Sequence, residues 1–104
     1  MLFYLIMTIK IEEKDNISTV YLEEKLDKNE SEKIKELIFP FVEAEKEVHL
    51  NLEKVQYIDS SGIANLIEMH QFALKKNTKI VLKKINKIVS AEINKCKLDE
   101  ILYF

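Results

Sequence analysis

The chain has 104 residues, of which 47% are hydrophobic and 33% are charged, and its formal net charge is −2 at pH 7. This composition suits one folded domain, and the interspersed charges exclude a basic nucleic-acid-binding tail or a basic membrane-surface helix. Cys96 is the only cysteine, so no internal disulfide can form. We therefore expect a cytoplasmic protein in which this thiol is buried and inert.

The chain opens with seven apolar residues, Met1 to Met7. This stretch is too short to span a bilayer and lacks the basic region and cleavage site of a signal peptide, so no membrane insertion is expected. Met7 is a candidate for an internal or alternative start, and residues 1–6 would then be an extension. Alternating apolar residues predict one strand over residues 3–13 and a second over Ile17–Glu23.

A helix is predicted after these strands. Apolar residues at helical spacing extend from Lys28 to about Ala44, and Asn29 or Ser31 is the expected N-cap. Pro40 lies inside this segment and has no N–H to donate to the preceding turn. We therefore expect a kink or a break near residue 39.

The second half continues to alternate between strands and helices. We expect strands over Glu47–Leu52 and Lys79–Leu82, and helices from Gly62 to about Lys76 and from Asn86 to about Cys96. Residues 98–104 are expected to pack back or to add an edge strand. Strands separated by helices imply parallel crossovers. The sequence therefore predicts an α/β fold: one domain with a mixed sheet, antiparallel in the first hairpin and parallel afterwards, with helices packed against it.

Gly62 is the only glycine of the chain, and it closes the motif Asp59-Ser60-Ser61-Gly62 between a strand and a helix. A single glycine is expected where no side chain fits, and we also expect it to let a partner's backbone approach. The motif places two hydroxyls and a carboxylate at the positive end of a helix dipole. These residues alone fit a helix cap or a site of chemistry.

The stretch Leu50–Ile63 and the order of elements over almost the whole chain resemble STAS domains, most closely the bacterial anti-sigma factor antagonists. That family has a strand, then Asp-Ser-Ser/Thr-Gly-aliphatic, then a helix. The matching residues here are Asp59, Ser60, Ser61, Gly62 and Ile63. The resemblance implies a single STAS domain over residues 1–104. Five glycine positions common in the family carry other residues here, namely Glu24, Ala64, Lys76, Asn77 and Lys97.

The resemblance implies a protein-binding switch, which is not an enzyme and needs no cofactor or metal. Ser60 matches the phosphorylated serine of the family. The unphosphorylated form would bind an anti-sigma factor that is also a serine kinase, and a serine phosphatase would reset the switch. Asp59, Ser61, Gly62 and Ile63 are expected to contact the partner. A phosphate adds nearly two negative charges beside Asp59, so it would weaken binding without refolding.

Two other functions remain open. One is a STAS subunit that binds a constant partner, a transport ATPase or a stress-sensing assembly, without phosphorylation. The other is a hydrolase built on Asp59, Ser60 and His70. It lacks a Gly-x-Ser-x-Gly elbow, and ten helical residues at about 1.5 Å each separate Ser60 from His70 by about 15 Å. We expect His70 to be a partly buried histidine bonded to backbone, and His49 to lie on the other face of its strand.

The helix after the motif carries a further candidate contact. Phe72 is expected to be exposed, on the same face as Asn65 and beside Met69. An exposed aromatic side chain next to a methionine is typical of a partner contact, and the alternative is that the N-terminal extension covers it. The apolar stripe on the opposite face is expected to contain Ile63, Ile67 and Leu74.

Overall fold

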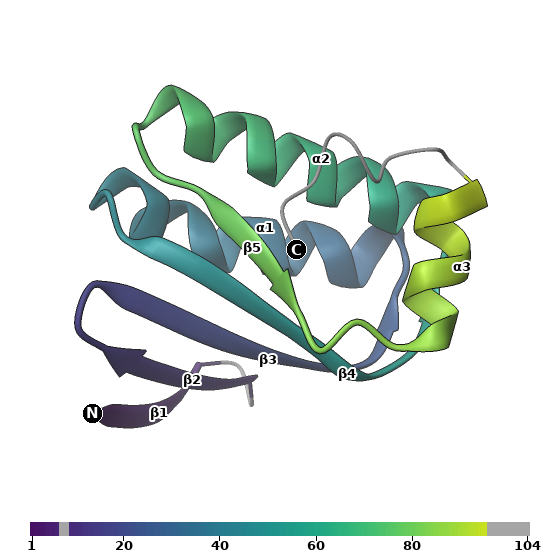
Figure 1. Cartoon of the computed structure of the whole chain (residues 1–104), viewed down its shortest axis with the longest axis horizontal. Helices are drawn as coiled ribbons and strands as arrows, with labels where there is room; N and C mark the ends of the chain where they lie inside the picture. The colour runs from purple at the N-terminus through teal and green to yellow at the C-terminus, as the bar shows by residue number, and fades with distance from the viewer. Residues whose placement is uncertain (7–8, 96–104) are drawn as a thin grey trace.

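The computed structural model describes residues 1–6 and 9–95 of the chain. In this part the elements follow in the order β1 (Leu2–Ile6), β2 (Ile9–Lys14), β3 (Ile17–Leu26), α1 (Lys28–Glu43), β4 (Glu47–Ile58), α2 (Ser60–Lys75), β5 (Ile80–Lys83) and α3 (Lys87–Lys95) (Figure 1). The predicted helix end at Cys96, the buried Cys96 thiol and the packing of residues 98–104 lie outside the described residues.

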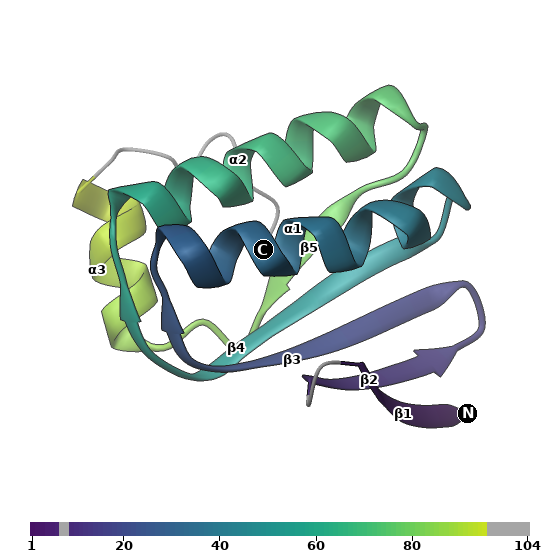
Figure 2. The ribbon, with the colours of Figure 1, turned by 180° about the vertical axis from the view of Figure 1, so that it is seen from behind.

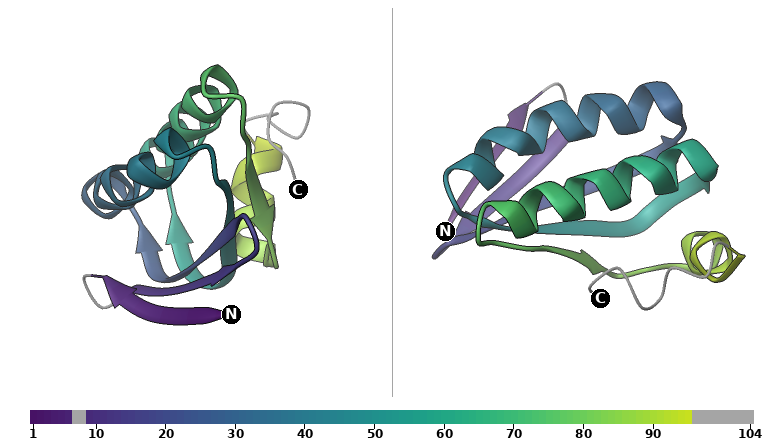
Figure 3. Two further views of the ribbon diagram at one scale, coloured as in Figure 1. Left: turned by 90° about the vertical axis from the view of Figure 1, so that its left-hand side faces the viewer. Right: turned by 90° about the horizontal axis from the view of Figure 1, so that it is seen from above.

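The strands form one sheet in the order β1-β2-β3-β4-β5. β1–β2 and β2–β3 are antiparallel pairs, whereas β3–β4 and β4–β5 are parallel. The predicted mixed sheet is therefore confirmed. α1 and α2 lie side by side on one face of the sheet, and α3 stands at its end, beside β4 and the start of α2 (Figures 2 and 3). No helix of the described part is long and apolar enough to cross a membrane.

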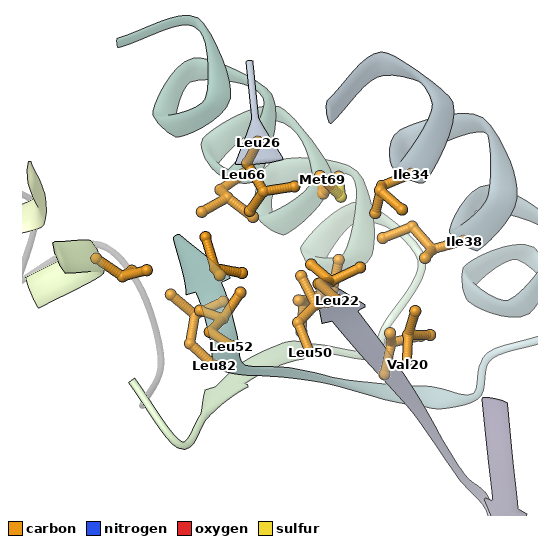
Figure 4. Packing of buried hydrophobic residues seen from close by; sticks show 14 of the residues in the cluster. Val20, Leu22, Leu26, Ile34, Ile38, Leu50, Leu52, Leu66, Met69 and Leu82 are labelled. Carbon is orange, nitrogen blue, oxygen red and sulfur yellow. The ribbon is translucent and has the colours of Figure 1, made fainter. Parts of the chain in front are cut away.

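The core lies between the sheet and the two long helices. β3 and β4 bury alternate side chains toward α1 and α2, because successive strand residues point to opposite faces. Each fully buried aliphatic side chain stabilises the fold by about 1.5–3 kcal/mol. Figure 4 shows this packing, with labelled members that are all buried: Val20, Leu22, Leu26, Ile34, Ile38, Leu50, Leu52, Leu66, Met69 and Leu82.

The single strand predicted over residues 3–13 is wrong. The chain forms two antiparallel strands there, with Ile6 opposite Ile9 and Tyr4 opposite Ile11. Residues 7 and 8, which separate the two strands in the sequence, include no glycine, proline, asparagine or aspartate that would signal a turn. β1 is consequently an additional edge strand, and the hairpin expected at residues 15 and 16 joins β2 to β3.

The ends of α1 also differ from the prediction. Asp27 is the N-cap, and its carboxylate accepts from the Glu30 N–H at 2.9 Å, so neither Asn29 nor Ser31 caps the helix. No break occurs at Pro40, because α1 continues to Glu43. Pro40 lies in the last turn, and its missing N–H leaves the carbonyl of Glu36 without a helical donor. Both residues are exposed, so water can bind this carbonyl.

Several turns use left-handed backbone without glycine. Glu24 and Asn77 each have a φ of 61°. Both stand at positions where the resemblance to the family would place a glycine. Asp15, Glu45 and Lys84 also have positive φ angles. Residues with a Cβ bear a steric cost of about 1–2 kcal/mol in this region. Glu24 lies at an irregularity in the β3–β4 register, where a bulge needs this conformation.

Candidate functional site

The candidate site lies where β4 ends and α2 begins. Asp59 is the N-cap, and its Oδ1 accepts from the Gly62 N–H at 3.0 Å. Its backbone carbonyl accepts from the Ile63 N–H at 3.0 Å. α2 therefore starts at Ser60, two residues before the predicted start at Gly62. Ser60 is exposed in the first turn, whereas Ser61 is half-buried.

Gly62 is needed for close packing and not for its backbone angle. Its φ is not positive, and the residue is buried. A Cβ at this position would lie 2.1 Å from the carbonyl oxygen of Leu26 and 3.0 Å from Cγ1 of Ile58. The prediction that no side chain fits here is confirmed. The space that we expected a partner's backbone to use is occupied by Leu26 of the same chain.

A second strand-to-helix junction lies beside the first. Leu26 and Ile58 are register partners at the ends of β3 and β4, and each is followed by an aspartate that caps a helix. The N-termini of α1 and α2 therefore lie at the same end of the sheet, where β3 and β4 end. The Glu30 N–H bond to Asp27, together with Lys25 at 3.4 Å, holds the pKa of that carboxyl below its usual range. The sequence carries the signal for Asp27, because Leu26-Asp27 repeats the pattern of Ile58-Asp59.

Tyr57 is a site residue that the sequence reasoning missed. It is 50% exposed, and its hydroxyl donates to Oδ2 of Asp59 at 3.2 Å. This hydrogen bond raises the pKa of Tyr57, and the negative charges of Asp59, Asp27 and Glu92 raise it further. The surface next to Ser60 therefore has a half-exposed aromatic ring near the carboxylates of Asp59, Asp27 and Glu92, of which Asp27 is paired with Lys25. The signal in the sequence is a large aromatic residue two positions before the capping aspartate, on a strand.

Asn65 faces α1 and is not a surface residue. Its side-chain amide donates to Oγ of Ser31 at 2.7 Å, and its carbonyl oxygen accepts from Lys35 Nζ at 3.2 Å. Lys35 also forms an ion pair with Glu68 at 2.9 Å. The surface position expected for Asn65 is wrong, because the residue is buried and its polar atoms bind α1, and its contact with a partner stays a prediction. It holds the helix that carries Ser60 against its neighbour.

Met69 and Phe72 are also turned inward. Met69 is 1% exposed. Phe72 is half-buried and stacks on Phe39 of α1, with ring centroids 4.2 Å apart. Within the stripe predicted for α2, Leu74 is exposed, and Ala73 is buried in its place. The expected exposed contact is wrong because α2 packs against both the sheet and α1, so two of its faces are buried.

The histidines do not approach the motif serines. His70 is buried within α2, and burial lowers its pKa below 6.5. His49 is half-buried on the other face of β4, where its imidazole hydrogen-bonds to Glu47. The arrangement gives no support to a hydrolytic triad of Asp59, Ser60 and His70. In the described part of the chain, no three His, Cys, Asp or Glu side chains are grouped to hold a metal ion.

Known proteins resemble this chain in fold. A crystal structure from Thermotoga maritima, of a candidate anti-sigma factor antagonist, matches with a TM-score of 0.81 at 17% identity over 93% of this chain and 85% of that chain. Unphosphorylated SpoIIAA, an anti-sigma factor antagonist, matches with a TM-score of 0.74 at 16% identity, over 90% of this chain and 84% of that chain. Phosphorylated Bacillus SpoIIAA matches with a TM-score of 0.70 at 15% identity, over 90% of this chain and 87% of that chain.

No curated protein matches the chain in sequence. The model of the STAS domain matches residues 8–104, which leaves only the first seven residues outside the match. The matched region includes the motif Asp59-Ser60-Ser61-Gly62 and strands β2 to β5. The chain therefore belongs to the STAS domain family.

Proposed function

We propose that this STAS domain is a cytoplasmic protein-binding switch controlled by phosphorylation of Ser60. Unphosphorylated, it binds an anti-sigma factor that is also a serine kinase, and a serine phosphatase restores this form. The observation that carries the proposal is the contrast within the motif. Ser60 is exposed at the start of α2, whereas Asp59 and Gly62 are occupied in building the junction.

The geometry supports a switch that needs no refolding. A phosphate on Ser60 would lie at a helix N-terminus, where free N–H groups and the helix dipole favour an anion. The same group would bring nearly two charges to a surface that already has Asp59, Asp27 and Glu92 near Tyr57. A partner that buries Ser60 would have to remove water from this charge. The phosphate is therefore tolerated by the domain and rejected by the interface.

The motif residues divide into two roles under this proposal. Ser60, Ser61, Asp59 and Tyr57 form the surface that a partner contacts. Gly62 and Ile63 are buried and fix the position of that surface. Structures of both the phosphorylated and the unphosphorylated forms of SpoIIAA, a protein of the same fold, make the same chemistry the first to test here.

The test uses the full chain as bait in its native cells. We expect one phosphate on Ser60 by peptide mass spectrometry, and a serine kinase among the captured proteins. Ser60→Ala should abolish the phosphate, and the neighbouring Ser61→Ala should leave most of it. The proposal is wrong if the phosphate remains in Ser60→Ala and is lost in Ser61→Ala, or if a constant partner is captured and no phosphate is found.

A further inference from the structure

β1 is the part of the sheet that the family match does not include. The match to the STAS domain family begins at residue 8, whereas β1 spans Leu2–Ile6. It pairs with β2 on one side, and no other strand of the described residues pairs with its second side. Its backbone donors and acceptors on that side form an edge to which another strand can bind.

The side chains of this edge strand are apolar. Residues 1–6 contain no charged side chain, and Leu2, Phe3 and Leu5 are 57%, 48% and 67% exposed. The opposite edge differs, because β5 has only four residues, ends at Lys83 and is flanked by Lys79 and Lys84. Short length and lysines are common protections against edge-to-edge pairing. The chain has this protection at β5 and lacks it at β1.

The sequence of β1 is complementary to itself. Tyr4 is the central residue, so an antiparallel copy places Phe3 opposite Leu5 and Leu2 opposite Ile6. Tyr4 pairs with buried Ile11, and Tyr4 and Ile6 pack against the core, which puts residues 2, 4 and 6 on the helix side. Phe3 and Leu5 lie on the other side. On each face, the paired strands would join apolar side chains to apolar side chains, and on the face of Phe3 the amine of Lys10 lies 4.9 Å from the ring centroid.

We propose that β1 binds β1 of a second copy of this chain, antiparallel about a two-fold axis at Tyr4. The two five-stranded sheets then form one continuous sheet. Such an interface is isologous, because the same patch is used on both copies. β2 and β3 separate β1 from β4, which leads into Ser60, so pairing leaves the candidate site accessible. This inference does not depend on the proposed switch.

The size of the interface sets its strength. A half-exposed aromatic or large aliphatic side chain leaves about 100 Å² in water, so three per copy give about 600 Å² over both copies. This area is well below the ~1,600 Å² of a standard stable interface. We therefore expect a weak, reversible dimer.

The first test is sedimentation velocity on the full chain from about 1 µM to about 1 mM. We expect a shift from monomer to dimer over this range. Leu5→Glu should move the midpoint to a concentration at least about tenfold higher, because the dimer would bury the carboxylate against Phe3 of the second copy. The variant should still fold, because in the monomer the carboxylate can pair with Lys10, the register partner of residue 5. Leu74→Glu, at an exposed leucine of α2, should leave the midpoint unchanged. Circular dichroism melts confirm that both variants fold.

The second test checks the register by cross-linking in a Cys96→Ser background. Tyr4→Cys should form a disulfide-linked dimer, because directly opposite Cα atoms are about 4.5–5.5 Å apart. Phe3→Cys alone should not, since its two copies would be about 8 Å apart, but it should cross-link with Leu5→Cys. A monomer at about 1 mM, or a dimer that Leu5→Glu leaves intact, overturns the proposal. Cross-linking of Phe3→Cys alone in place of Tyr4→Cys overturns the register.

Discussion

The carbonyl oxygen of Leu26 lies 2.1 Å from the position that a Cβ on residue 62 would take. Leu26 ends β3 and Gly62 lies in the first turn of α2, so this contact fixes one strand-to-helix junction against the other. Ser60 is two residues from the contact. The position of the candidate phosphoacceptor therefore depends on the absence of a side chain at residue 62.

Gly62→Ala is predicted to destabilise the domain by about 2 kcal/mol, because the backbone at Leu26 must move to admit the methyl group. The sign is diagnostic, since alanine in place of glycine normally stabilises a helix by about 0.5–1 kcal/mol. Urea denaturation measures the change. The matched control is Ala64→Gly, an exposed position in the same turn, which should cost about 1 kcal/mol. A stabilised Gly62→Ala would show that the junction is not close-packed.

Glu24→Gly is predicted to raise the free energy of unfolding by up to about 1 kcal/mol. Glu24 has a φ of 61°, which glycine adopts without the steric cost of a Cβ. Glu23→Gly is the control, because this exposed neighbour has an ordinary φ and should lose about 0.5–1 kcal/mol on replacement. Equal losses in both variants would contradict the strain that we assign to Glu24.

The sequence predicted the junction well because its signals are local. Asp59-Ser60-Ser61-Gly62 follows a strand pattern and precedes a helical one, and one glycine in 104 residues marks a position of close packing. The contact that requires this glycine comes from Leu26, on another strand, and no local pattern identifies it. The sequence therefore indicated that residue 62 has no room for a side chain. We expected this space to be left for a partner's backbone, whereas Leu26 of the same chain fills it.

The surface of α2 was predicted less well. Helical periodicity identifies one apolar stripe, but α2 is covered by the sheet and also by α1. Met69 and Phe72 consequently looked exposed in the sequence and are buried or stacked in the structure. Likewise, no glycine, proline, asparagine or aspartate stands between β1 and β2, so the division into two strands could not be predicted from the sequence pattern.

The stability of the domain is predicted to fall as the pH drops below about 6.5. Burial lowers the pKa of His70 below 6.5, so the unfolded chain takes up a proton in this range that the folded chain excludes. The free energy of unfolding then decreases as pH falls, by up to about 1.4 kcal/mol per pH unit. Asp27 and Glu13, whose carboxyl pKa values are lowered, add their losses only below about pH 4.5.

Denaturation at pH 7.5, 6 and 5 checks this prediction. His70→Gln should flatten the dependence, whatever its effect on stability at pH 7.5. Parallel curves for His70→Gln and the wild type would show that His70 is not the group responsible.

The central claim is that charge at Ser60 controls binding and leaves the fold unchanged. Ser60→Asp adds one negative charge at the N-terminus of α2, where a carboxylate is favourable by about 0.3–1 kcal/mol. A mismatched charge in a desolvated interface costs about 2 kcal/mol or more, and 1.4 kcal/mol is a factor of ten in affinity. Gln71→Glu adds the same charge at an exposed position of α2 and serves as the control.

The most direct measurement is a thermal melt and a calorimetric titration of each variant against the serine kinase captured from native cells. We predict that Ser60→Asp melts within a few degrees of the wild type and binds at least about tenfold more weakly. Gln71→Glu should match the wild type in both measurements. Wild-type affinity in Ser60→Asp would contradict the account, because Ser60 would then lie outside the interface.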